Sequence, residues 1–148
     1  MHILVSACLL GEPCRYDGGS KPCAAVRSLS DGGHVLHPVC PEVDGGLPTP
    51  RVPCEVVESS TDARVVSARG VDCTDAYRSG ARHAVEAAQR EGCSVAVLKA
   101  KSPACGSGRI FDGTFSGVLR DGWGIAAAAL RDVGVRVVDE EHVANLGL

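Results

Sequence analysis

The stretch Ser94-Val95-Ala96-Val97-Leu98-Lys99-Ala100, followed directly by Lys101-Ser102-Pro103-Ala104-Cys105-Gly106, decides the fold of this chain. Its first part is a short continuous apolar run, which is typical of a strand buried on both faces of a parallel sheet. Its second part is a turn that places a cysteine between a proline and a glycine. We therefore expect a central strand that delivers Ser102 and Cys105 beyond its carboxyl end.

Two other apolar runs end in the same way. Residues 3–7 are predicted to form a first buried strand that stops at about Cys8, and residues 34–39 a second one that is followed by Cys40-Pro41-Glu42. The carboxyl ends of parallel strands share one edge of a sheet, and ligands of such sheets bind outside that edge. The pattern therefore predicts that Cys8, Cys40 and Cys105 converge at one rim.

The rest of the chain completes an alternation of strands and helices. Helical spacing or helix-forming residues occur over 20–30, 75–91, 123–132 and 140–145, a further strand is expected at 135–138, and 54–58 with 64–69 are expected to pair around a turn at 59–62. The stretches 43–53 and 106–117 are rich in glycine and are predicted to be loops. This order indicates a three-layer Rossmann-like or flavodoxin-like α/β fold, with a parallel sheet, helices on both faces and a small β-hairpin insertion.

Composition limits the classes of function. A chain of 148 residues with 45% hydrophobic content predicts a single domain over 1–148. The net charge of −3 and the lack of aromatics within basic runs argue against binding to polymeric nucleic acid. No run approaches the length of a membrane span and the first apolar run is too short for a signal peptide, so we expect a cytoplasmic protein. Eight cysteines in that compartment point to metal binding or catalysis more than to disulfides.

Three thiolates at one rim can hold Zn²⁺ with one open position, or an iron-sulfur cluster in which one iron lacks a protein ligand. The spacing alone does not choose between these groups. Cys14 lies in the loop that starts at Cys8 and can fold back to the same rim, which makes it an alternative ligand. The remaining cysteines are expected to be small packing residues: Cys23, Cys54, Cys73 and Cys93.

Two polar residues lie next to this predicted site. Glu42 can orient a water or move a proton beside a metal, or it can be a solvated loop charge. Ser102 can donate a hydrogen bond to a substrate, or it can simply start the turn. Among the charged residues of the neighbouring loops, Arg51 and Lys101 are candidates for contacts with a substrate.

A series of short motifs runs through nearly the whole chain. In order they are Ala7-Cys8-Leu9-Leu10-Gly11, Arg15-Tyr16-Asp17-Gly18, Cys40-Pro41-Glu42 with Gly45-Gly46-Leu47-Pro48-Thr49-Pro50-Arg51, Gly70-Val71-Asp72, Leu98-Lys99 with Ser102-Pro103-Ala104-Cys105-Gly106, and Asp112-Gly113-Thr114-Phe115. In combination they resemble the bacterial family, long labelled a domain of unknown function, that includes the 2-thiouracil desulfurases.

The resemblance implies an oxygen-sensitive [4Fe-4S] cluster held by Cys8, Cys40 and Cys105, with one iron not bound by protein and open to the sulfur of a substrate. It also implies catalytic roles for Glu42 and Ser102. The implied activity is a non-redox desulfuration of a 2-thiouracil-like nucleobase or a related small thioamide, releasing the oxo product and sulfide. One departure concerns the substrate, because the family often has a second serine where this chain has Ala104.

The implied chemistry agrees with the residues. A thiocarbonyl sulfur is a soft ligand for iron, and its binding withdraws electrons from the carbon that water attacks. Glu42 would act as general base or proton shuttle, and Ser102 would hydrogen-bond to the heterocycle or relay a proton. The sequence leaves two other functions open, namely a non-catalytic iron-sulfur or thiol redox sensor that works through the cluster or Cys14, and a zinc hydrolase that uses the same three cysteines with Glu42 as base.

Overall fold

A central sheet organises the computed structural model, which describes residues 1–57 and 63–148. Its four parallel strands are β1 (His2–Ser6), β2 (Val35–Val39), β5 (Val95–Leu98) and β8 (Arg136–Asp139), in the order β2-β1-β5-β8. The apolar run at 94–100 forms β5, which pairs with β1 on one side and β8 on the other. Because the chain leaves β1 toward β2 and later returns to the other side of β1, the strand order reverses between β1 and β5, where ligands of such sheets bind.

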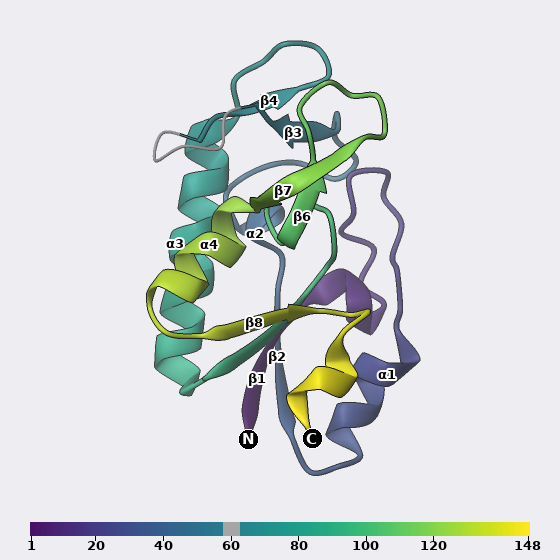
Figure 1. The fold of residues 1–148 in the computed structure, drawn as a ribbon, viewed down its shortest axis with the longest axis vertical. Helices are drawn as coiled ribbons and strands as arrows, with labels where there is room; N and C mark the ends of the chain where they lie inside the picture. The colour runs from purple at the N-terminus through teal and green to yellow at the C-terminus, as the bar shows by residue number, and fades with distance from the viewer. Residues whose placement is uncertain (58–62) are drawn as a thin grey trace.

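Alternate residues of the strands face opposite sides of the sheet. Leu4 and Leu98 pack in one core cluster with α3 (Thr74–Glu91) and α4 (Ile125–Asp132), whereas Ile3, Val5 and Val97 pack in a second one. The second cluster is covered by α1 (Ala24–Arg27) and by the 3-10 turns η1 (Ala7–Leu10), η2 (Ser28–Ser30) and η3 (Val143–Leu146). Helical segments therefore lie on both faces of the sheet (Figure 1), which confirms the predicted α/β class.

The longest helix follows its sequence signals. Cys73 precedes the helix and makes no side-chain capping hydrogen bond, while the Asp72 side chain accepts the Thr74 N–H at 2.9 Å. At the other end Gly92 takes a left-handed φ of +66°. A short helix that we did not expect, α2 (Pro41–Asp44), packs against it. Pro41 occupies the first turn, where its missing N–H costs nothing. The glycines that follow made this segment look like an irregular loop.

Two antiparallel hairpins stand at the carboxyl end of the sheet (Figure 1). The predicted one consists of β3 (Cys54–Val56) and β4 (Val65–Ser67), while its expected turn at 59–62 lies outside the described residues. The other consists of β6 (Ser107–Phe111), which lies within the predicted loop over 106–117, and β7 (Leu119–Trp123), where no strand was predicted. Trp123 thus ends a strand, and the helix predicted over 123–132 begins at Ile125. The strands β6 and β7 are only half-buried and polar in part, so they lack the apolar run that marks a buried strand.

Two predicted helices are shorter in the structure. The helix expected over 20–30 is reduced to α1 followed by η2, and the one expected over 140–145 is the single 3-10 turn η3. In the part of the chain that the structure describes, no helix is both long and apolar enough to cross a membrane.

Candidate functional site

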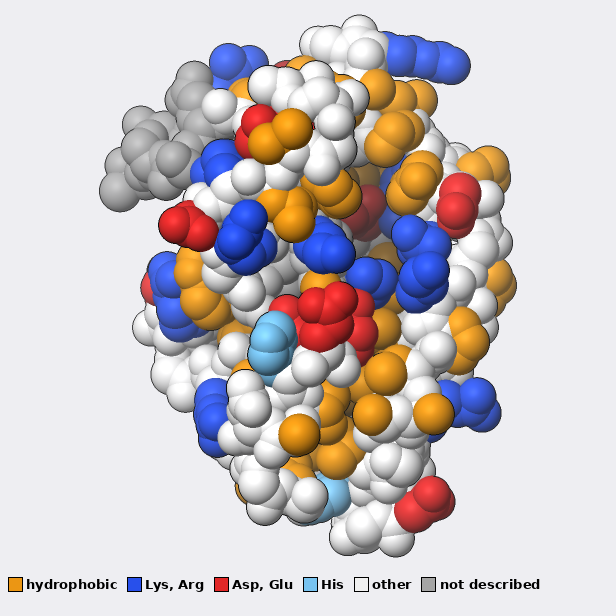
Figure 2. Space-filling view, turned by 45° about the vertical axis from the view of Figure 1, so that its right-hand side comes forward, with side chains coloured by type: hydrophobic (Ala, Val, Ile, Leu, Met, Phe, Trp, Pro, Cys, Tyr) orange, Lys and Arg blue, Asp and Glu red, His pale blue; other side chains and the backbone are white. Residues whose placement is uncertain are grey.

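A cavity of about 590 Å³ is lined by residues that follow β1, β2 and β5 and by residues of the two hairpins. Hydrophobic and basic side chains border this hollow in Figure 2. Every residue that the sequence singled out for the site lines it: Cys8, Cys40, Glu42, Arg51, Lys101, Ser102 and Cys105. The structure thus brings together residues that are almost a hundred positions apart, as the parallel-sheet argument predicted.

The ends of three strands position the three cysteines. Cys8 lies in η1 directly after β1, Cys40 joins β2 to α2, and Cys105 closes the turn after β5. The Ser6 hydroxyl donates to the Cys105 thiol at 3.4 Å and accepts the backbone N–H of Lys99 at 2.9 Å. Ser6 therefore links the ends of β1 and β5 and fixes the Cys105 side chain within the cavity wall.

Burial dominates the electrostatics of these thiols. Desolvation and the neighbouring Cys40 raise the pKa of Cys8 to about 11, although Lys99 and Arg15 act in the opposite direction. Desolvation raises the pKa of Cys105 well above its usual range, and the hydrogen bond from Ser6 only partly offsets this. Near neutral pH both groups are therefore thiols in the absence of a cation. A bound metal ion or cluster would supply the positive charge that their thiolate forms require.

Two more cysteines line the cavity. Cys14 lines the cavity and its carbonyl oxygen lies 3.8 Å from the Cys40 sulfur, so the loop after Cys8 does fold back to the rim. Burial, followed by the proximity of Cys40, raises the pKa of the Cys14 thiol to about 12. Cys54 also lines the cavity at the start of β3. Cys54 is at the same time buried in a core cluster, as its predicted packing role requires. Its place follows from the hairpin folding over the carboxyl end of the sheet, which no local sequence signal indicates.

Glu42 is held by Arg51. The Arg51 Nε lies 2.8 Å from Glu42 Oε1, and the two side chains are only 7% and 15% exposed. The Nη1 and Nη2 atoms of the same guanidinium donate to the carbonyls of Pro48 and Cys14 and to the hydroxyl of Thr49. Every nitrogen of Arg51 thus already has a protein acceptor. This geometry fits a role of Arg51 in positioning Glu42 better than the predicted contact of Arg51 with a substrate.

Tyr77 on α3 adds a group that the sequence analysis assigned only to the helix core. Its side chain is fully buried and lines the cavity, and burial together with the charge of Glu42 raises the pKa of its hydroxyl far above the usual range. Among the described residues, this hydroxyl is the one buried side-chain oxygen or nitrogen without a hydrogen-bond partner. Buried polar groups are nearly always paired, so this hydroxyl, whose main charged neighbour is Glu42, is an exception in the cavity wall.

Ser102 and Lys101 lie in the turn after β5. The Ser102 hydroxyl oxygen accepts the N–H groups of Ala104 at 3.1 Å and of Cys105 at 2.8 Å. With its lone pairs engaged, it has only its own hydrogen to offer to the cavity, which makes it a donor. Lys101 has a φ of +71°, and the other described non-glycine residue with a positive φ, Phe115 at +57°, lines the same cavity. Backbone strain of this kind concentrates at functional sites.

Lys99 brings a second buried cation to the wall. Its Nζ lies 2.9 Å from Glu140 Oε1, and the other oxygen of that carboxylate accepts the Ala100 N–H at 2.8 Å.

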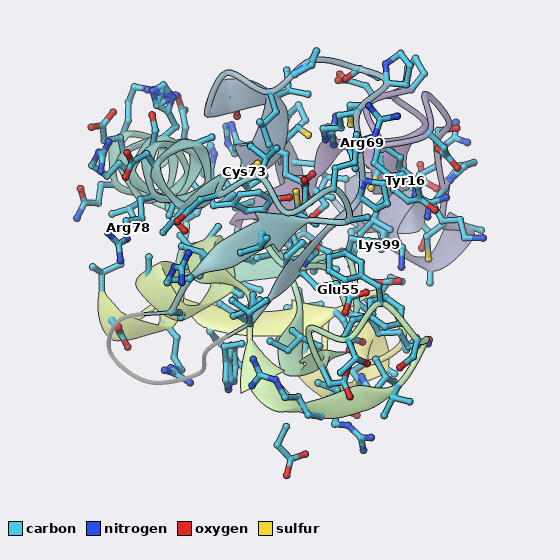
Figure 3. The ribbon with its side chains drawn as sticks, turned by 90° about the horizontal axis from the view of Figure 1, so that it is seen from above. Tyr16, Glu55, Arg69, Cys73, Arg78 and Lys99 are labelled. Carbon is cyan, nitrogen blue, oxygen red and sulfur yellow. The ribbon has the colours of Figure 1, made fainter. Side chains whose placement is uncertain are left out.

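Figure 3 shows Lys99, Tyr16 and Glu55 on one side of the molecule, away from Arg78 on α3. The sequence offered no signal for Glu55, because only the pairing of β3 beside the cavity brings it there.

Comparisons with known proteins agree with this geometry. The sequence model of a protein family described as 2-thiouracil desulfurase matches residues 3–142. The solved structure of TudS, described as a [4Fe-4S]-dependent thiouracil desulfidase, is 42% identical and superposes with a TM-score of 0.90 over 99% of this chain and 95% of its own. The uncharacterized protein YbbK of Bacillus subtilis is 39% identical over 97% of this chain and 99% of its own length.

Proposed function

Since the chain belongs to the 2-thiouracil desulfurase family and is a desulfurase-like enzyme, we propose that it hydrolyses the carbon-sulfur bond of a thiolated nucleobase of the 2-thiouracil type or of a related small thioamide. The products are the oxo compound and sulfide. The observation that carries this proposal is the single cavity in which Cys8, Cys40 and Cys105 face the Glu42 carboxylate and Ser102. Family membership also confirms the resemblance inferred from the motifs.

The donor set fits an iron-sulfur cluster. Thiolates are the ligands that such clusters use, and the three thiols come from three separate strand ends around one space. We assign Cys8, Cys40 and Cys105 as the ligands of a [4Fe-4S] cluster in which one iron is not bound by protein. TudS, with its [4Fe-4S] dependence, supports this assignment. When bound, such a group supplies a Lewis-acidic iron that polarises a thiocarbonyl.

The spacing of the thiols favours a cluster over zinc. Tetrahedral zinc with bonds of about 2.3 Å needs sulfur atoms about 3.8 Å apart. Within residues 1–57 and 63–148, the one set of three metal-ligating side chains whose ligand atoms all lie within 4.8 Å of one another is Asp139, Glu141 and His142, and not the cavity cysteines. In this structure, then, the three sulfur atoms do not all lie within 4.8 Å of one another, a wider spread than a tetrahedral zinc site needs, and this supports the assignment of a cluster.

The protein's own residues supply the proton chemistry. Glu42, held in place by Arg51, accepts a proton from the water that attacks the thiocarbonyl carbon. Ser102 donates a hydrogen bond to the heterocycle and orients it. Water provides the oxygen of the product and both protons, the carbon-oxygen bond forms as the carbon-sulfur bond breaks, and no electrons are exchanged. The buried walls of the cavity limit bulk water around the reacting carbon.

The experiment is anaerobic reconstitution with iron and sulfide, followed by the absorbance of 2-thiouracil and the sulfide released. The wild type is expected to convert the substrate, and Glu42→Gln to lose at least about 100-fold in kcat with its cluster intact. Glu86→Gln, on the exposed face of α3, is the matched control and should keep full activity. A fully reconstituted wild type that leaves several thiolated pyrimidines intact would overturn the proposal, and full activity of Glu42→Gln would remove Glu42 from it.

A further inference from the structure

We propose that Phe115 forms the wall on which a flat, conjugated substrate stacks, and that Glu55 is the positioning residue that holds Phe115 there. This inference rests on the proposed function and deepens it, because it gives planar heterocyclic thioamides a contact with the protein that acyclic thioamides cannot make. The first observation concerns composition. The chain has only two tyrosines and two phenylalanines, and all four, Tyr16, Tyr77, Phe111 and Phe115, line this cavity.

The Phe115 side chain is partly exposed to solvent rather than buried. It lies in the loop between β6 and β7, remains 39% exposed and has a left-handed φ of +57°. Such a conformation is strained for a bulky residue and persists only where the surroundings impose it. Because the side chain is not part of the main core clusters, that strain is not offset by core packing of its ring. The strained residue is one of those that line the cavity, which agrees with a role at this site.

Glu55 on β3 imposes this conformation. Its Oε1 accepts the backbone N–H groups of Gly113 at 2.9 Å and of Phe115 at 3.1 Å. The residue is only 9% exposed, and no lysine, arginine or histidine among the described residues forms an ion pair with it. A carboxylate buried without a cation is costly, and here the two amide donors are what stabilise it. Glu55 thus ties the 112–118 loop to the first hairpin.

The rest of the loop has a defined shape. Gly113 has a φ of +94°, and a side chain at this position would place its Cβ only 2.9 Å from the Val56 carbonyl oxygen. The Asp112 side chain accepts the Thr114 N–H at 2.9 Å, and the Asp112 N–H donates to the Val118 carbonyl at the same distance. The Phe115 residue is therefore part of a preorganised segment of the cavity wall. An aromatic face of this kind contributes about 0.5–1.5 kcal/mol to the stacking of a conjugated ring.

The experiment measures the binding of uracil, which is planar and has no sulfur to lose, to the reconstituted protein by isothermal titration calorimetry. It also compares KM for 2-thiouracil with KM for thioacetamide, a small acyclic thioamide. Phe115→Leu should weaken uracil binding and raise KM for 2-thiouracil about 3- to 10-fold, with KM for thioacetamide unchanged. Phe115→Tyr, which keeps the aromatic face, should remain within about twofold of wild type.

Glu55 is tested through a pair of variants. Glu55→Gln keeps a carbonyl oxygen for the two amides and should bind uracil like the wild type, whereas Glu55→Ala should match Phe115→Leu. If Glu55→Ala does not fold, uracil binding by Glu55→Gln and by the two Phe115 variants still tests the inference. Equal uracil binding by wild type and Phe115→Leu, or no uracil binding by the wild type, would overturn the inference. Uracil binding through Phe115 without turnover of any thioamide would refute the proposed function and leave this inference standing.

Discussion

The contact between α2 and α3 gives a sharp prediction for Gly80→Ala. A Cβ at Gly80 would lie 1.8 Å from the Pro41 carbonyl oxygen and 2.6 Å from its carbonyl carbon, so the two helices meet backbone to backbone. Neither group is the end of a flexible side chain. Alanine at this position must therefore push the helices apart by more than about 1 Å. The displaced helix α2 carries Glu42, and Cys40 precedes it directly.

Two opposing terms set the magnitude. Replacing glycine by alanine within a helix contributes about 1 kcal/mol of stability through propensity. Overpacking a close contact costs about 1–3 kcal/mol or more, and a contact between two backbones belongs at the upper end. We expect Gly80→Ala to lose about 2 kcal/mol in free energy of unfolding. A shift of about 1 Å at the Glu42 carboxylate should also lower activity about 100-fold.

Urea unfolding followed by circular dichroism measures the first effect, and turnover per reconstituted cluster measures the second. Ser79→Ala, one residue earlier in the same helix, is the matched control, because it changes helix propensity without that contact; it should be neutral or slightly stabilising. A Gly80→Ala protein as stable as Ser79→Ala, with full activity, would refute the close approach of α2 and α3.

Three further predictions concern single side chains. Arg51→Met leaves the Glu42 carboxylate unpaired and should lower the free energy of unfolding in urea by about 3 kcal/mol. Arg109→Met, which removes an exposed ion pair, should change that free energy by less than about 0.5 kcal/mol. Equal effects of the two variants would contradict the buried pair. Tyr77→Phe removes an unpartnered hydroxyl and should leave Tm unchanged or raise it, so that a loss above about 1 kcal/mol would reveal a hidden partner. The Asp139 carboxylate, whose Oδ1 lies 2.6 Å from His142 Nδ1, raises the pKa of His142. The stability that this pair contributes is therefore present below the ordinary histidine pKa and is lost as the pH rises through the raised pKa. An NMR titration in which Asp139→Asn does not lower the pKa of His142 would contradict this prediction.

The local sequence pattern was sufficient to predict the strands that are buried on both faces of the sheet. The runs that became β1 and β5 are continuous and apolar, and the helix over 74–91 has apolar residues at helical spacing and ends at Gly92, so their places follow from periodicity. The convergence of Cys8, Cys40 and Cys105 followed from one rule, that parallel strands share a carboxyl edge. The site could be predicted because its residues come directly after those strands.

The roof of the cavity could not be predicted in the same way. The strands β6 and β7 are polar in part and are held together by pairing with each other, so they show no apolar run. Glu55, Tyr77 and Cys54 look like ordinary strand or helix residues, and only the position of each element over the sheet makes them part of the site. These contacts depend on packing between elements, which the sequence pattern does not encode locally.

The most direct measurement is the iron, zinc and acid-labile sulfide content of protein purified without oxygen. A [4Fe-4S] cluster at Cys8, Cys40 and Cys105 predicts about four iron and four sulfide per chain, lost when any one of the three is changed to serine and kept in Cys23→Ser, which lies outside the cavity lining. Stoichiometric zinc without acid-labile sulfide, or an iron content that does not depend on these three cysteines, would contradict it.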